Sequence, residues 1–474
     1  MNLFERTKQF AEIQLFKGLV KVLPRLSEEK LLGLARPYME KIPFEGGKDA
    51  MKRLLCLAKR FCNEASKNCL MKMIENFMIN VCIKGSSRRN EVENEYGISV
   101  PSLFVISPSM GCNLNCYGCY AGEYNKSKED RLSNETFSRI CREAKEVGIY
   151  FVTVTGGEPF FYPGLLDLFA EHNDMYFQIY TNGTLIDKKV AARLAEVGNA
   201  FPCISVEGFE KETDARRGKG VFRKTIEAMH NLREAGAFYG YSATVTRENN
   251  ELLVSDEFVD FYIEQGCFLG WYFNYVPIGR KPNLELMPTP EQRDYRRARL
   301  DEIRRDKPIF LADFWNDGPL VGGCIAGGRD YFHINNKGDV EPCVFCHFTV
   351  DNIHDKSFLE VLQSDFFKAI QKRQPYTTNH LRPCMLIDNP QILRDVVREV
   401  GARPSHPGAD SLINELADDM DRYSAAYGAI ADRVWDEEFA AYPQDLFIYD
   451  FEKHAEELRE KKRKKRRSRQ KRTA

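Results

Sequence analysis

Residues 111–120 read Gly-Cys-Asn-Leu-Asn-Cys-Tyr-Gly-Cys-Tyr and place three thiols close together, at Cys112, Cys116 and Cys119. Spacings of four and three would also put these cysteines on one face of a core helix. The intervening glycine and asparagine residues are poor helix formers that favour turns, so we predict a compact loop. Three thiolates leave one iron of a four-iron cluster without a protein ligand, and the loop therefore predicts a cluster with one open position.

Zinc is the alternative metal for this loop. Structural zinc sites use four protein ligands, commonly supplied by paired Cys-x-x-Cys arms. No fourth ligand lies near the three cysteines in the sequence. The spacing therefore favours an iron–sulfur cluster.

Around this loop, from Leu103 onward, short β-rich runs alternate with helical segments, as is typical of βα units and a parallel sheet. Six strands are predicted, at residues 103–107, 150–154, 176–180, 201–206, 239–245 and 270–276. Six parallel units form either an open barrel or a doubly wound sheet. Both arrangements place functional loops at the carboxyl ends of the strands, and the cysteine loop directly follows the first strand.

Polar motifs follow the other predicted strands. The second strand ends in Thr-Gly-Gly-Glu-Pro, where Gly156 and Gly157 let the backbone approach a ligand and Glu158 offers an acceptor for an ammonium group. A plain strand-to-helix turn would also use two glycines. The next strands end in further polar residues, namely Asn182, Ser205, Glu207 and Arg247. An arginine fork suits a carboxylate, although a surface arginine is the alternative interpretation of Arg247.

The Cys-x3-Cys-x2-Cys spacing, followed by Gly-Gly-Glu-Pro after the next strand, resembles the radical S-adenosylmethionine (SAM) superfamily. The resemblance implies a partial (β/α)6 TIM-like barrel and a [4Fe-4S] cluster that cleaves SAM to a 5′-deoxyadenosyl radical, which abstracts hydrogen from a substrate. By resemblance, Cys112, Cys116 and Cys119 hold the cluster. The implied SAM contacts are Tyr117, Gly118, Gly156, Gly157, Glu158, Asn182, Ser205, Glu207 and Arg247. The residue before the last cysteine, often aromatic in that superfamily, is Gly118 here.

A second group of cysteines follows the predicted barrel, at Cys324, Cys343, Cys346 and Cys384. Four thiols saturate an auxiliary four-iron cluster, and Gly338 is expected to form the hairpin turn that brings Cys324 towards Cys343. The spacing resembles the SPASM and Twitch extensions of the same superfamily, and four cysteines favour a single cluster. A zinc knuckle, built from the same four cysteines or with His347 replacing one of them, is the alternative.

Composition and patterning divide the 474 residues into several parts. We predict a helical N-terminal region (1–95), a barrel (96–308), a SPASM/Twitch-like module (309–390), a helical C-terminal region (391–460) and a basic disordered tail (461–474). The remaining seven cysteines are predicted to be buried, reduced thiols. These are Cys56, Cys62, Cys69, Cys82, Cys141, Cys203 and Cys267.

The sequence leaves the substrate open. A peptide or protein, a lipid or other membrane-associated molecule, and a small soluble metabolite are the candidates, and no catalytic acid or base stands out. The resemblance implies a reductant such as flavodoxin or ferredoxin. We expect a cytoplasmic enzyme, because no apolar run reaches membrane-spanning length. The amphipathic N-terminus would allow peripheral membrane contact, and the ten Lys or Arg of residues 461–472 would suit anionic lipid or nucleic acid. A non-enzymatic iron–sulfur electron carrier is the rival class.

Overall fold

The structure is a computed structural model that describes residues 26–40, 45–122, 130–279 and 281–439. The predicted amphipathic stripe near the N-terminus and the basic tail lie outside these residues. Within the described ranges, no helix is both long enough and apolar enough to cross a bilayer.

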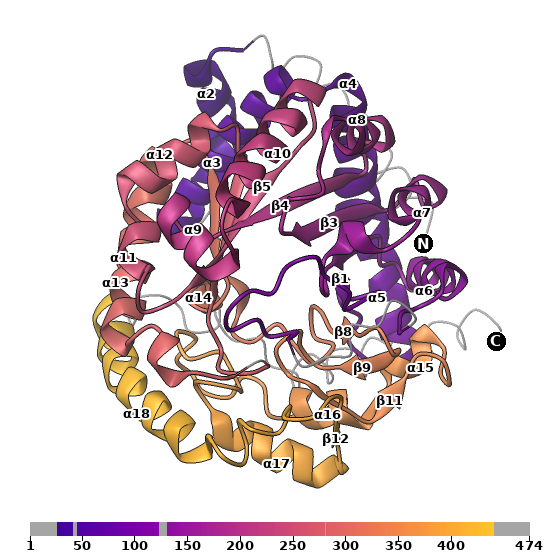
Figure 1. The fold of residues 1–474 in the computed structure, drawn as a ribbon, viewed down its shortest axis with the longest axis vertical. Coiled ribbons are helices and arrows are strands. Elements are labelled where there is room, and N and C mark those ends of the chain that lie inside the picture. Colours follow the sequence, from indigo (N-terminus) through magenta and orange to yellow (C-terminus); the bar gives the residue numbers. More distant parts are fainter. Residues whose placement is uncertain (1–25, 41–44, 123–129, 280, 440–474) are drawn as a thin grey trace, which may run out of the picture.

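A parallel sheet forms the centre of the molecule, and helices cover its outer side (Figure 1). Its parallel strands are β1 (Leu103–Ile106), β2 (Phe151–Val154), β3 (Tyr176–Thr181), β4 (Ala200–Val206), β5 (Gly240–Val245), β6 (Leu269–Asn274) and β7 (Phe310–Asp313). The six predicted strands are confirmed to within two residues at each end. β7 was not predicted; it pairs with β6 from Leu269↔Phe310 to Tyr272↔Asp313 and extends the sheet.

Helices alternate with these strands, and their starts follow capping rules. The Asp187 carboxylate accepts a hydrogen bond from the Val190 amide, and Thr289 forms a capping box with Gln292. The helices that follow the strands are α6 (Asn134–Glu146), η3 (Pro159–Phe161), α7 (Leu165–Glu171), α8 (Lys188–Val197), α9 (Glu210–Arg217), α10 (Val221–Ala235), α11 (Asn250–Leu253), α12 (Asp256–Glu264), η4 (Leu284–Leu286) and α13 (Pro290–Asp306). Their apolar faces and the sheet enclose the main hydrophobic core.

The region after the barrel continues the same sheet. β8 (His333–Ile334) pairs in parallel with β1, and β9 (Asp339–Glu341) and β11 (Asp351–Asn352) follow it in antiparallel order. The remaining elements are α14 (Gly318–Val321), β10 (Phe348–Thr349), α15 (Phe358–Leu362), α16 (Asp365–Gln371), α17 (Pro390–Val400), β12 (Arg403–Pro404), α18 (Ala417–Val434) and η5 (Trp435–Phe439). β8 finds its backbone partners on the edge of β1, so the central sheet continues into this region.

A buried polar chain also joins this region to β1. His333 Nε2 lies 2.7 Å from Ser107 Oγ, and His333 Nδ1 lies 2.6 Å from Glu341 Oε2. All three side chains are at most 1% exposed. Because Ser107 directly precedes the segment that leads to the cysteine loop, this chain fixes the C-terminal region against the carboxyl end of β1.

The N-terminal helices close the opposite end of the barrel, at the amino ends of the strands. They are α2 (Glu28–Met39), α3 (Glu45–Glu64), α4 (Lys67–Lys72), the π-helix η2 (Met73–Gly85) and α5 (Ser86–Tyr96). Phe61 packs edge-on against Phe238 and Phe268, with ring centroids 4.8 and 5.5 Å apart. Cys69 is buried as predicted, whereas the prediction for Cys82 is wrong, because its position on η2 is exposed.

Polar side chains on α4 and η2 bind the loops that enter β3 and β4. Asn68, Lys72, Asn76 and Asn80 recur every four residues; Asn68 donates to a carbonyl in the last turn of α8, and the other three donate to carbonyls of the loop before β3. Asn76 is 2% exposed, and its Nδ2 donates to the carbonyls of Asn173 and Met175 at 2.8 and 2.7 Å. This spacing was visible in the sequence but was not interpreted.

Replacing Asn76 with alanine is expected to reduce the free energy of unfolding by about 2 kcal/mol, because the carbonyls of Asn173 and Met175 would each lose one hydrogen bond. Urea unfolding followed by circular dichroism measures the change. Asn94→Ala is the control, since its Nδ2 donates only to the carbonyl of Asn90 on an exposed helical surface. Equal stability of the two variants would contradict the assigned role of Asn76.

Candidate active site

The cysteine loop lies at the carboxyl end of β1 and has no regular helix. The glycines of the next turn pack directly against it. A Cβ atom on Gly156 would lie 2.4 Å from the Ser109 carbonyl oxygen, and one on Gly157 would lie 2.3 Å from that of Gly111. The amide of Glu158 donates to the Gly111 carbonyl at 2.8 Å. The two glycines are therefore required for contact between the two loops, in addition to any contact with a ligand.

Cys112, Cys116 and Cys119 converge on one cavity of 260 Å³. Burial raises the pKa of the Cys112 thiol, and metal binding would remove its proton. Gly118 also lines the cavity and has a φ of 63°; a Cβ atom there would lie 2.9 Å from the ring of Tyr275. This close approach explains why a glycine stands where an aromatic residue was expected.

Nowhere in the described ranges do three His, Cys, Asp or Glu side chains lie close enough together to hold a single metal ion.

Glu158 locks the end of β3 to the glycine turn. It is fully buried, its Oε1 accepts from Thr181 Oγ1 at 2.6 Å, and its Oε2 accepts from the Asn182 amide at 2.7 Å. Burial raises the pKa of this carboxyl, and these hydrogen bonds oppose that effect. Glu158 lies behind the cavity wall, whereas Asn182 lines it and donates to Asn113 Oδ1 at 2.9 Å.

Glu207 is 1% exposed and binds two arginines of α9 that the sequence analysis missed. Its Oε1 accepts from Arg216 Nη1 at 2.7 Å and from Arg217 Nε at 2.8 Å, while its Oε2 has no partner among the described residues. Both arginines line the cavity, and Arg216 Nε also donates to the Tyr117 carbonyl at 3.2 Å. Burial alone would lower the pKa of Arg217, but Glu207, Cys116 and Cys119 raise it.

Like Glu158 and Glu207, two further predicted contacts do not line the cavity. Tyr117 is 47% exposed, and its hydroxyl accepts from Asn283 Nδ2 at 3.0 Å. Arg247 forms an exposed ion pair with Glu285 at 2.6 Å. It therefore lies at the surface, which was the alternative interpretation of this arginine. Ser205 does line the cavity. The signal for Arg216 and Arg217 was a pair of adjacent arginines at the end of the helix that follows strand four.

Inside the barrel the cavity becomes apolar and extends to the C-terminal region. Among the described residues that line it, Arg216 and Arg217 are the only ones with a charged side chain. The inner wall consists mainly of aromatic and aliphatic residues, including Leu103, Tyr180, Trp271, Phe273, Phe314, Ile325, Tyr331, Val344 and Phe345. Thr153, Gln178 and Ser242 add polar groups to this mainly apolar wall.

The second cysteine group surrounds a smaller cavity of 50 Å³, lined by Cys324, Cys343 and Cys384. Cys346 is buried beside them and donates its amide to the Cys343 carbonyl at 3.0 Å. The predicted turn is confirmed, because Gly338 has a φ of 80° and donates its amide to the Asn335 carbonyl between β8 and β9. Burial raises the pKa of Cys343 to about 12, so this thiol keeps its proton until a metal displaces it.

Hydrogen-bond donors surround this cavity, and the sulfur atoms of a cluster would be their acceptors. The Tyr331 hydroxyl lies 2.8 Å from Cys343 Sγ. Trp315 lines the cavity, is 2% exposed, and its Nε1 has no partner among the described residues. His347 does not complete a zinc site, because its Nδ1 lies 2.6 Å from His406 Nε2 and its Nε2 lies 2.9 Å from the Val344 carbonyl.

Comparison with known proteins agrees with this geometry. The profile of the radical SAM superfamily matches residues 106–253, and that of an iron–sulfur cluster-binding domain called SPASM matches residues 324–385. Mycofactocin maturase MftC of Mycolicibacterium smegmatis is 30% identical over 297 residues, covering 59% of this chain and 75% of the relative. Fe-coproporphyrin III synthase of Methanosarcina barkeri is 26% identical over 318 residues, covering 60% and 79%. SuiB of Streptococcus suis, solved with its precursor peptide SuiA, has a TM-score of 0.50 at 24% identity and covers 60% and 69%.

The chain belongs to the radical SAM superfamily. It is a radical SAM enzyme with a SPASM domain. The radical SAM domain binds SAM and a [4Fe-4S] cluster, and the SPASM domain binds auxiliary iron–sulfur clusters. When bound and reduced, the first cluster cleaves SAM to methionine and a 5′-deoxyadenosyl radical that abstracts hydrogen from the substrate. An electron carrier without enzymatic activity is therefore excluded.

Proposed function

We propose that Cys112, Cys116 and Cys119 hold the SAM-cleaving cluster and that the enzyme modifies a peptide by hydrogen abstraction. The observation that supports the ligand assignment is the convergence of these thiols with Gly156, Gly157 and two arginines on one cavity. Cys324, Cys343, Cys346 and Cys384 would hold one auxiliary cluster. The likeness in fold to a protein solved with its precursor peptide, and the maturase among the relatives, support a peptide substrate.

In this proposal each wall of the cavity has a distinct task. Glu158 and Asn182 fix the glycine turn against the cysteine loop, so that the backbone there can receive the amino group of the methionine moiety. Glu207 holds Arg216 and Arg217 at the cavity through its Oε1. Phe273, Phe314 and Phe345 keep water from the reacting atoms.

Arg217 replaces Arg247 as the proposed partner of the methionine carboxylate, because Arg217 lines the cavity. Replacing Arg217 with methionine is expected to raise the KM for SAM about tenfold, as expected for losing a hydrogen bond to a charged group. The rate of 5′-deoxyadenosine formation at a series of SAM concentrations measures this change.

Arg247→Met is the matched control, since that side chain pairs with Glu285 on the surface. We expect its KM to equal that of the unmodified protein. A raised KM for Arg247→Met with no change for Arg217→Met would restore the assignment made from the sequence.

A lipid substrate is the second candidate, and the apolar inner wall of the cavity favours it. Oxygen-free reconstituted enzyme, SAM and a chemical reductant should be incubated separately with peptide and lipid fractions of the cell. Mass spectrometry then identifies the modified product. We expect modified peptides that depend on SAM, whereas modified lipids alone would replace the peptide proposal with the lipid one.

A further inference from the structure

A shared wall separates the SAM cavity from the auxiliary cysteine site. Four residues line both cavities, namely Phe314, Ile325, Tyr331 and Phe345. Tyr331 is the only one of the four with a polar side-chain atom. Its hydroxyl group points towards the auxiliary site, where it lies 2.8 Å from Cys343 Sγ.

The backbone of Tyr331 is held before any cluster binds. Its amide donates to the Ile325 carbonyl at 3.1 Å, and its carbonyl accepts from the Gly328 amide at 3.0 Å. The side chain is 3% exposed, and its ring packs edge-on against Phe314. The phenol therefore has little freedom to turn away from the thiol.

The phenol must donate once Cys343 is a ligand, because a metal-bound thiolate has no proton. Cys343 Sγ also accepts from the Phe345 amide, at 3.4 Å. In the SAM site, Cys112 receives weaker contacts, from the Leu114 amide at 3.4 Å and Asn182 Nδ2 at 3.9 Å. A short bond from a neutral phenol thus distinguishes the auxiliary site from the SAM site.

We propose that Tyr331 is a positioning residue of the auxiliary cluster, whose hydrogen bond to the Cys343 thiolate raises the reduction potential of that cluster. Reduction adds negative charge to the cluster sulfurs, so a fixed donor stabilises the reduced state more than the oxidised state. This inference rests on the proposed assignment of Cys343 as a ligand. It does not depend on the peptide substrate.

The test measures the midpoint potential by electron paramagnetic resonance during a redox titration. The full chain carries alanine at Cys112, Cys116 and Cys119, so that only the auxiliary cluster contributes to the signal. We expect Tyr331→Phe to lower the ratio of reduced to oxidised cluster at a fixed potential about tenfold, which corresponds to about 59 mV for one electron. An unchanged potential in a fully loaded variant would overturn the proposal.

Tyr239→Phe is the control, because it removes a phenol that donates to the Gln265 carbonyl in the barrel. Its potential should equal that of the parent protein, and an equal shift in both variants would also overturn the proposal. If Tyr331→Phe loses iron, site-specific 3-fluorotyrosine at position 331 gives a stronger donor. The potential should then rise, and a constant potential would refute the role of the phenol. If the potentials shift as expected but no modified peptide is found, the proposed peptide substrate is wrong and the role of Tyr331 stands.

Discussion

Replacing Cys116 with alanine is expected to abolish the release of 5′-deoxyadenosine from SAM. The loop supplies three thiols to one cavity, so replacing one of them removes a proposed ligand of the cluster. Loss of an outer-shell partner typically costs 10–100-fold, so loss of a direct ligand should lower the rate by more than about 100-fold. Anaerobic assay of reconstituted protein with a reductant measures this rate.

Iron analysis separates loss of the cluster from loss of folding. With one four-iron cluster at each site, the bound iron should fall from about eight to about four atoms per chain. Cys82→Ala is the matched control, because that thiol lies exposed on η2 in the N-terminal region. It should retain all of the iron and the activity. A Cys116→Ala variant with full iron content and full activity would refute the assignment of the loop.

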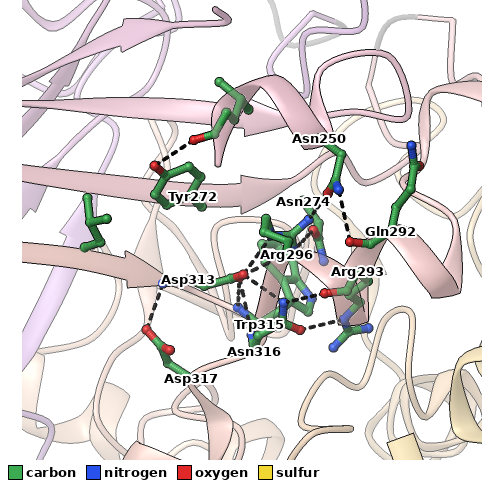
Figure 2. Close-up of polar contacts among 12 residues, drawn as sticks. Asn250, Tyr272, Asn274, Gln292, Arg293, Arg296, Asp313, Trp315, Asn316 and Asp317 are labelled. Carbon is green, nitrogen blue, oxygen red and sulfur yellow. Dashed lines mark hydrogen bonds and ion pairs between the residues drawn. The ribbon is translucent and has the colours of Figure 1, made fainter. Parts of the chain in front are cut away.

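Replacing Arg293 with methionine is expected to lower the free energy of unfolding by about 3–5 kcal/mol, because a buried carboxylate would lose its cation. Arg293 and Asp388 are both 0% exposed at their side chains and are joined at 2.5 and 3.2 Å. Figure 2 shows Arg293 beside Asn316. The Nε of Arg293 donates to the Oδ1 of Asn316 at 3.0 Å. The guanidinium also lies 3.7 Å from the centre of the Tyr427 ring.

This change should also affect the auxiliary cysteine site. Asp388 Oδ2 accepts from the Cys384 amide at 3.0 Å, and the Asp388 amide donates to the Cys384 carbonyl. Urea unfolding measures stability, and iron content reports the site. Arg398→Ala is the control, since its exposed pair with Asp395 should contribute less than about 1 kcal/mol. A loss below this value for Arg293→Met would contradict the structural role of the pair.

Adding a second change tests whether the cost comes from the unpaired carboxylate. In the double variant Arg293→Met, Asp388→Leu, no isolated buried charge remains, so part of the lost stability should return. The Cys384 amide would still lack its acceptor, so iron binding should remain weaker. Stability no better than that of Arg293→Met would indicate that packing around Tyr427 and Asn316 accounts for the loss.

The network in Figure 2 joins α13 to strands β6 and β7 through contacts that local sequence patterns do not reveal. Arg296 donates to Asn274 Oδ1 at 2.6 Å, to Asn250 Oδ1 at 2.8 Å and to Asp313 Oδ2 at 2.7 Å. α13 supplies Arg296, and β6 and β7 supply Asn274 and Asp313. A helix with several buried arginines does not resemble an amphipathic core helix, because its charges are neutralised only by distant segments.

The sequence by itself determined the class of cofactor, the six first strands and the order of their motifs. Cys112, Cys116, Cys119 and the Gly156–Gly157 turn are close in sequence to strand ends, so local spacing and alternation were enough to interpret them. Gly338 was likewise identifiable, because its turn depends on a few adjacent residues.

Only the tertiary structure decided which charged side chains face the cavity at the cysteine loop and how the two cysteine sites adjoin. It placed Arg216 and Arg217 at the cavity and Arg247 at the surface, and it placed Tyr331 between the two sites. Burial and ion pairing depend on residues far apart in the chain, and the direction of a long side chain follows from those partners. A sequence motif fixes backbone position at a strand end, but it does not fix which neighbour neutralises a charge.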